Sequence, residues 1–447
     1  MARRLACAGA NVLLVDAGCA VSAVVGTHLR NLPACRTDPG LYRALARSLL
    51  RPLSSAGSAR GLPGLRITPV AGGMGALWNC VVPRFHAQRE RWSAVPASEW
   101  QSLYVEAEQL LGADPQFGAG STRQQAMLDA LADRFGAAAA APAPIAAHSA
   151  APGGPKWTGA AEVLDPAHQD HNGRLRVLAQ HTVRLLHHRS GRVTGAQAVD
   201  ATSGQSVELS ASAFVVAAGA LAGPALLWAS GVHAEDGSDS AIGRYLTDHP
   251  IAFGRVLIDT PDTPANDPEA CVMMPLSADR AIHGVASCDL EGDEGLAGLL
   301  DTRRVASLYW YPLIGQHREN RIRFEEHGTD SLGLPVLSFE YRLREDERTA
   351  LAGAVEDLRA AGNALGRFLP AAPPQALAAG SSMHLLGTTR LGERDDGSSV
   401  ADAHGRAWRF ENLYVAGTGA IPTASATNPT LTACALAVRT ARHILAS

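Results

Sequence analysis

Short apolar runs that end at a glycine or an acidic residue recur along the chain. Residues 11–15 end at Asp16, residues 213–217 precede Gly219, and residues 413–416 stop at a glycine turn. A short apolar run followed by glycine is typical of a buried parallel strand whose turn lets backbone approach a ligand. The pattern predicts strands of a nucleotide-binding α/β fold.

Apolar positions at helical spacing predict several helices. They cover residues 2–9, 100–111, 123–135, 224–230 and 344–369, and a C-terminal helix from about residue 429. In the last case we expect Thr427 or Asn428 to cap the free amides and Pro429 to take the first helical position. A glycine turn followed by such a helix start would suit an anionic or electron-rich ligand.

Alternating patterns predict two antiparallel regions, a β-meander over residues 175–217 and a larger sheet over residues 251–384. Residues 20–66 should be loop-rich, and residues 137–155, rich in alanine and proline, should form a surface connection. The fold class is therefore α/β with an α+β part. We expect a split Rossmann-like domain, at residues 1–250 and 385–447, interrupted by an antiparallel-sheet substrate domain at residues 251–384.

Composition narrows the class of protein. The 447 residues are 46% hydrophobic and 18% charged, with a formal net charge of −4, as in an ordinary globular enzyme. Neither nucleic acid nor a membrane is favoured as a partner, and we expect a cytoplasmic protein. The seven cysteines show no metal-ligand spacing. Asp165, His168, Asp170 and His171 are irregularly spaced, which favours a solvated turn over a metal site.

Asp16 ends its strand as the ribose-binding acid of a dinucleotide fold does. That acid follows the GxGxxG fingerprint by about 20 residues, so the fingerprint would precede Met1. We expect the first strand and glycine loop to be missing, because the true start lies upstream or the chain is a fragment.

Seven segments carry a family resemblance. They are VLLVDAG (12–18), GGMGALWNCVVPRF (72–85), VVAAGAL (215–221), IGRYLTDHP (242–250), NRIRF with DSLGLP (320–335), MHLLGTTRLG (383–392) and NLYVAGTGAIPTASATNPTLTA (412–433). On these segments the chain resembles the glucose–methanol–choline (GMC) flavin oxidoreductases. Within that family it is similar to the pyranose-oxidase-like branch and its bacterial glycoside (C-glycoside) oxidases.

The resemblance implies an FAD site and a catalytic pair, His384 and Asn428. Leu77 stands where covalently flavinylated pyranose oxidases carry histidine, so we expect FAD to be bound non-covalently. The implied FAD-binding residues are Asp16, Gly72, Gly73, Met74, Trp78, Val183, Gly219, Gly417, Gly419, Asn428, Pro429 and Thr430.

The implied activity is oxidation of a secondary ring hydroxyl of a pyranose or glycoside to a ketone, with hydride transfer to FAD. His384 would act as the base and Asn428 would orient the hydroxyl. Oxygen or a quinone-like compound would accept the electrons, and the protein could be oligomeric. For His249 the residues alone favour a structural role. Two alternatives stay open: a truncated, cofactor-free remnant that at most binds sugar, and an NAD-type dehydrogenase, which Asn428-Pro429 disfavours.

Overall fold

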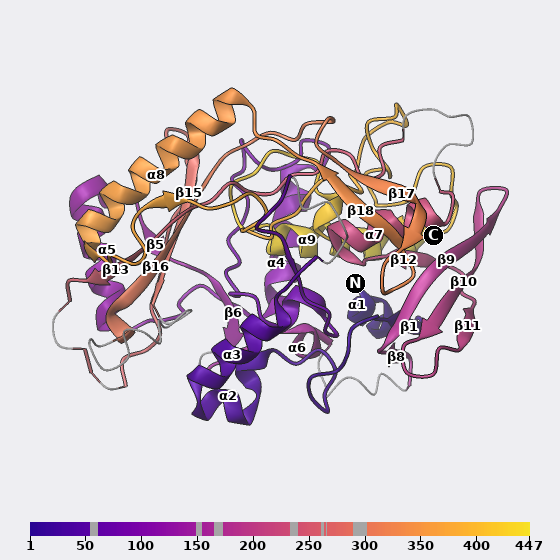
Figure 1. Ribbon diagram of the computed structural model, residues 1–447, viewed down its shortest axis with the longest axis horizontal. Helices are drawn as coiled ribbons and strands as arrows, with labels where there is room; N and C mark the ends of the chain where they lie inside the picture. The colour runs from indigo at the N-terminus through magenta and orange to yellow at the C-terminus, as the bar shows by residue number, and fades with distance from the viewer. Residues whose placement is uncertain are drawn as a thin grey trace.

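The computed structural model describes residues 1–53, 61–148, 154–164, 173–232, 240–260, 263–264, 266–288 and 302–447. The loop with Asp165, His168, Asp170 and His171 lies outside these ranges. Figure 1 shows the large sheet and helix α8 (Glu345–Leu365) at one end of the molecule, and a three-stranded ribbon within residues 181–209 at the other end. Helices α4 (Ala97–Leu111) and α9 (Thr430–Ala446) lie between them. No described helix is both long and apolar enough to cross a membrane.

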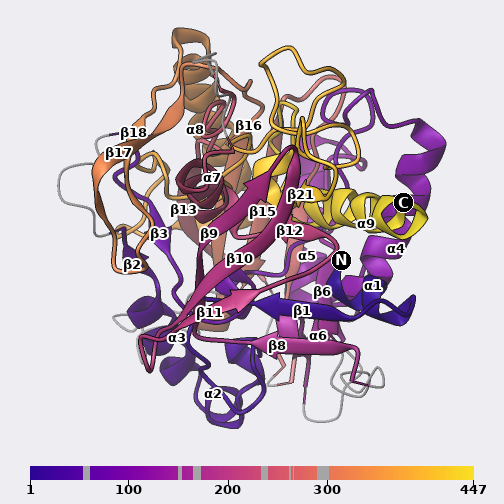
Figure 2. The same ribbon diagram turned by 90° about the vertical axis from the view of Figure 1, so that its right-hand side faces the viewer.

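The predicted buried strands form two short parallel pairs. β1 (Val12–Val15) pairs with β8 (Leu175–Leu178), and β12 (Phe214–Val216) pairs with β21 (Leu413–Val415), as Figure 2 shows. The strand predictions are confirmed, but β8 and β12, which the expected meander at residues 175–217 included, belong to these parallel pairs and not to the meander. Leu175 of β8 packs with Ala6 of α1 (Ala2–Cys7) and Leu164 of α6 (Ala160–Leu164), so burial draws this strand toward β1.

The meander itself is confirmed in three strands. β11 (Ser206–Leu209), β10 (Arg192–Asp200) and β9 (His181–Arg189) pair in that order, antiparallel throughout. Ser190 and Gly191 both have positive φ, at 48° and 76°, as a two-residue type I′ turn requires. Helix α7 (Gly219–Ala229) packs against β9 and starts five residues earlier than the pattern predicted.

Among the described residues the largest sheet has seven strands. Its order is β19 (Gly366–Phe368), β13 (Ala252–Ile258), β16 (Val305–Pro312), β15 (Ile282–Cys288), β14 (Cys271–Met274) and β5 (Ala141–Pro142), and β20 (Gln375–Ala376) also pairs with β13. Helices α8 and α5 (Thr122–Phe135) contact it, and Met127, Leu358 and Trp310 lie in the shared core. β17 (Arg321–Thr329) and β18 (Pro335–Glu340) form a separate hairpin, so the expectation that residues 251–384 contribute to a single sheet is wrong for these two strands.

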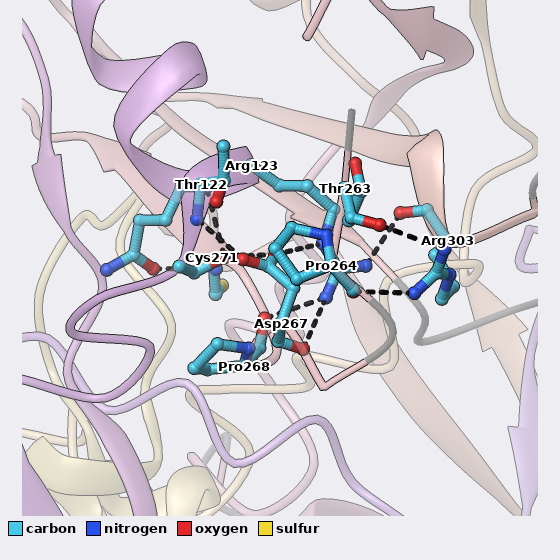
Figure 3. A network of polar contacts seen from close by, with 10 residues as sticks. Thr122, Arg123, Thr263, Pro264, Asp267, Pro268, Cys271 and Arg303 are labelled. Carbon is cyan, nitrogen blue, oxygen red and sulfur yellow. Dashed lines mark hydrogen bonds and ion pairs between the residues drawn. The ribbon is translucent and has the colours of Figure 1, made fainter. Parts of the chain in front are cut away.

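A buried ion pair ties α5 to the loop before β14 (Figure 3). Arg123 Nε donates to Asp267 Oδ2 at 2.7 Å, and both side chains are only 1% exposed. The Thr122 amide and the Ser121 hydroxyl donate to the same carboxylate at 2.7 and 2.8 Å. Although burial opposes it, these donors lower the pKa of Asp267 to about 2. The network therefore fixes the helix on one side of the sheet.

Two regions differ from the sequence-based expectation. Residues 20–66 contain α2 (Pro33–Thr37), α3 (Pro39–Leu49), β2 (Arg51–Pro52) and β3 (Arg66–Ile67), so the loop-rich expectation is wrong. The missed signal is Asp38, whose side chain accepts the Leu41 amide at 3.1 Å and caps α3.

Residues 137–155 are not simply a surface connection. They include β5 and β6 (Ile145–His148), which pairs with β4 (Ala113–Asp114) and β7 (Lys156–Trp157). Ile145, Ala146 and Ala147 are buried in the main core. The domain boundaries at residues 250 and 384 stay a prediction.

Candidate active site

His384 and Asn428 lie together although 44 positions separate them. His384 is in the loop after β20, and Asn428 comes two residues before α9. The distance from Asn428 Nδ2 to His384 Nε2 is 3.5 Å, which is at the long limit of a hydrogen bond. The polar tips of the two side chains therefore meet.

Two further histidines join this pair from the large-sheet side. His249, just before β13, has its Nδ1 atom 3.1 Å from His384 Nδ1. His283, in β15, has its Nε2 atom 3.2 Å from Asn428 Oδ1. His249 thus contacts the predicted base directly, beyond the structural role that the sequence favoured. His283 was not among the predicted site residues, and its one local signal is that it and Ser287 are polar residues in a largely apolar strand.

Tyr311 of β16 lies beside all three histidine rings. Its ring centroid is 5.3 Å from that of His384, 6.0 Å from His249 and 6.4 Å from His283. The phenol is buried, so the cluster has an aromatic wall toward the sheet.

Burial sets the protonation of the cluster. It lowers the pKa of His384 to about 4 and the pKa of His283 to about 3. The pKa of His249 is lowered well below its usual value by burial and by the two neighbouring histidines. All three rings are neutral at pH 7, so each keeps one nitrogen that can accept a proton.

Asp248 fixes the loop that carries His384. Its carboxylate accepts the Gly380 amide at 2.9 Å, the His384 amide at 3.0 Å and the Ser382 hydroxyl at 2.6 Å. Burial raises the pKa of Asp248 to about 6, against the effect of these donors. Met383, directly before His384, has φ of 57°, a conformation that such a residue keeps only when its surroundings hold it.

Glu90 fixes the loop that carries Asn428. Its side chain is buried, and Oε1 accepts the amides of Ala426 and Thr427 at 2.8 and 2.9 Å. Oε2 accepts the Thr427 hydroxyl at 2.9 Å and the His86 amide at 2.7 Å. Four donors compensate the buried charge, so the loop has one preferred position.

The prediction that Thr427 or Asn428 caps the C-terminal helix is wrong. Within the described residues no side chain caps α9, because Thr427 binds Glu90 and the Asn428 amide faces the two histidines. Pro429 is the residue before the helix, and Thr430 is its first residue. The N–H groups of the first turn therefore stay available to a ligand at the positive end of the helix dipole.

Three of the candidate glycines border open space. At Gly73 (φ +56°), Gly219 (φ +78°) and Gly417 (φ +105°), an added Cβ would meet no described atom within 4 Å. Gly72 and Gly419 differ. A Cβ added at Gly72 would lie 3.0 Å from Ala160 Cβ, and one added at Gly419 would lie 2.8 Å from Thr389 Oγ1. The first three glycines can let a flat ligand approach the backbone, while the other two allow close packing.

Comparison with known proteins identifies the family. A GMC oxidoreductase N-terminal model matches residues 78–251, and the C-terminal model matches residues 316–437. A C-glycoside 3-oxidase of Arthrobacter globiformis is 32% identical, over 86% of this chain and 75% of its own length. The chain belongs to the GMC oxidoreductase family. A pyranose 2-oxidase of Lyophyllum shimeji is 28% identical, over 94% of this chain and 79% of its own.

The fold of this GMC oxidoreductase is also found in a solved structure. The crystal structure of pyridoxine 4-oxidase from Mesorbium loti superposes with a TM-score of 0.68, at 21% identity, covering 100% of this chain and 96% of that one. The prediction of a mixed α/β GMC fold with a large antiparallel sheet is confirmed. The family implies an FAD cofactor.

Asp16 and Trp78, two further candidate residues for FAD binding, lie beside the glycine segment. Asp16 accepts the Gly18 amide at 2.7 Å and the Gly72 amide at 2.9 Å, so it joins β1 to that segment. Each carboxylate oxygen retains a lone pair for a ribose hydroxyl. Trp78 donates from its indole to the Thr158 carbonyl at 2.7 Å, which holds the ring beside the 3₁₀ turn at Gly73–Ala76.

Met74 lies in that turn, where its sulfur accepts the Thr68 hydroxyl at 2.9 Å. Val183 is farther along the chain, in β9, where it pairs with Ala198 of β10. The FAD-binding roles of these residues stay predictions.

Proposed function

We propose that this GMC oxidoreductase uses FAD to oxidise a secondary ring hydroxyl of a pyranose or glycoside to a ketone. The observation that carries the proposal is a half-buried His384, neutral at pH 7, beside Asn428 and next to the uncapped start of α9. Relatives named as C-glycoside 3-oxidases and pyranose 2-oxidases support the substrate class.

The chemistry divides between the two side chains. Nε2 of His384 accepts the proton of the substrate hydroxyl, and Nδ2 of Asn428 donates a hydrogen bond to the oxygen as its negative charge grows. Bound FAD supplies the acceptor for the hydride that leaves the ring carbon. The first-turn amides of α9 stabilise negative charge that develops beside them.

The residues present fit FAD. The open space at Gly73, Gly219 and Gly417 gives the backbone approach that an extended flat cofactor needs. Pro429 and Thr430 would hold the reducible end of the cofactor at the helix start, and Asp16 would hold its adenosine ribose. Leu77 has an aliphatic side chain that cannot form a covalent flavin bond, so full denaturation should release all the flavin into the supernatant. Yellow colour kept in the pellet would contradict non-covalent binding.

Anaerobic reduction tests the activity. Protein prepared with excess FAD should lose its flavin absorbance bands when a glycoside is added. His384→Ala should keep the flavin but slow this reduction by about 100-fold to 10,000-fold, the usual contribution of a general base. His187→Ala, in the half-exposed face of β9, is the matched control and should reduce normally.

The outcomes separate the alternatives. An undiminished rate in His384→Ala would show that another group is the base. A chain that stays colourless with FAD yet binds sugar would instead support the cofactor-free remnant. Reoxidation by oxygen or by a quinone then identifies the electron acceptor.

A further inference from the structure

A line of buried polar contacts runs from Ser425 to the predicted base. Ser425 Oγ is 2.8 Å from His249 Nε2, and His249 Nδ1 is 3.1 Å from His384 Nδ1. Ser425 and His249 are both fully buried. Since a neutral imidazole carries one N–H and one lone pair, the direction of one hydrogen bond fixes the other in each ring.

Two proton arrangements satisfy these contacts. In the first, His384 donates from Nδ1 to His249 Nδ1, and His249 donates from Nε2 to Ser425. In the second, Ser425 donates to His249 Nε2 and His249 donates from Nδ1 to His384 Nδ1, so the proton of His384 is on Nε2. Only the first arrangement leaves a lone pair on His384 Nε2, the atom that faces Asn428.

The other side of the cluster favours the first arrangement. An amide nitrogen only donates, so Nδ2 of Asn428 beside His384 Nε2 needs a lone pair there, while Oδ1 accepts from His283 Nε2–H. His283 Nδ1 is buried and has no hydrogen-bond partner among the described residues. In the first arrangement this atom is a lone pair. The second arrangement requires the Asn428 amide to be turned over, so that Oδ1 accepts from His384 Nε2–H and Nδ2 donates to His283 Nε2. His283 Nδ1 then becomes a buried N–H without an acceptor among the described residues, which is the rarer situation in proteins.

We infer that His249 is a positioning residue that sets the tautomer of His384, with the proton on Nδ1 and the lone pair on Nε2. The role of that lone pair rests on the proposed function, because it is what accepts the substrate proton. When Nε2 takes the proton, Nδ1–H keeps its acceptor on His249, so the ring does not have to turn. Ser425 holds His249 in the matching orientation from its far side.

Two replacements of His249 separate tautomer control from packing. His249→Asn keeps an oxygen near the position of Nδ1 that can accept from His384, whereas His249→Phe keeps a ring without an acceptor. We expect the rate constant of flavin reduction at saturating glycoside to fall about 100-fold or more in His249→Phe, and less than about 10-fold in His249→Asn. KM should change little, since substrate contacts stay. If His249 only fills space, phenylalanine will be tolerated as well as asparagine or better, and that result overturns the inference.

A second readout needs no turnover. In FAD-loaded protein labelled with ¹⁵N-histidine, the resonance that disappears in His384→Ala should show a protonated Nδ1 and an unprotonated Nε2. His249→Phe should shift this resonance toward a tautomer mixture. A protonated Nε2 in the wild type overturns the inference even if glycoside is oxidised. A protonated Nδ1 in a protein that no glycoside reduces upholds the inference and refutes the proposed function.

Discussion

Replacing Glu90 with glutamine should destabilise the protein by loosening the loop that carries Asn428. Oε1 accepts two backbone amides, from Ala426 and Thr427, and Oε2 accepts the His86 amide and the Thr427 hydroxyl. Glutamine keeps one oxygen for the two loop amides. Its NH₂ group then faces the His86 N–H, so a buried donor loses its acceptor.

The magnitude follows from these contacts. A buried donor left without an acceptor costs about 1–3 kcal/mol. The two remaining amide bonds lose their charge assistance, which makes such bonds roughly twice as strong as neutral ones. If each of these two hydrogen bonds loses about 0.5 kcal/mol and the unpaired His86 N–H costs about 2 kcal/mol, Glu90→Gln should lower the free energy of unfolding by about 3 kcal/mol. A looser Asn428 should also slow flavin reduction by about 10-fold.

The assay is urea unfolding followed by tryptophan fluorescence, with the FAD concentration held constant. The matched control is Glu108→Gln on α4, because Glu108 binds Arg84 with both oxygens but is 30% exposed. That change should cost less than about 1 kcal/mol, as for other surface ion pairs. If the two variants lose the same stability, the assigned role of Glu90 is refuted.

Three further results are expected. Burial lowers the pKa of His384 to about 4, so the rate constant of flavin reduction should be constant above about pH 6 and should fall only near pH 4. Anaerobic stopped-flow absorbance measures this rate constant, and a midpoint near pH 6.5 would contradict the prediction. Gly417→Ala (φ +105°) should lose bound FAD, whereas Gly136→Ala, with similar strain at φ +98° on the surface, should retain it, as measured by flavin absorbance. The pKa of Asp267 is about 2, below its unfolded value near 3.9, so the stability from its pairing with Arg123 is present above about pH 4 and is lost as pH falls toward 2. Asp267→Asn should therefore lower the urea midpoint at neutral pH and flatten its decline in acid.

Local pattern was sufficient for many elements. The apolar runs that became β1, β12 and β21, and the periodic segments that became α4, α5 and α9, were predictable because neighbouring residues dictate their preference. β5 was not predictable in this way, because its pairing partner in β14 lies about 130 residues later, at Met273 and Val272. Composition alone made that segment resemble a linker.

The residues of the candidate site also differ in whether the sequence alone could predict them. His384 and Asn428 were identifiable from segments that resemble the family. Glu90 and His283 were not, because their contacts with the 426–428 loop span 336 and 145 positions. A buried carboxylate and a strand histidine acquire these roles only when distant loops meet.

By itself, the sequence determined the family, the short buried strands and the glycine turns, because strand runs and glycine conformations depend on the residue and its immediate neighbours. The tertiary structure alone decided which polar groups pair. In the folded chain the Thr427 hydroxyl bonds to Glu90 and does not cap α9, and His249 lies against His384. The physical reason is that a buried donor or acceptor must take whatever partner the folded chain brings within reach, since water is excluded there.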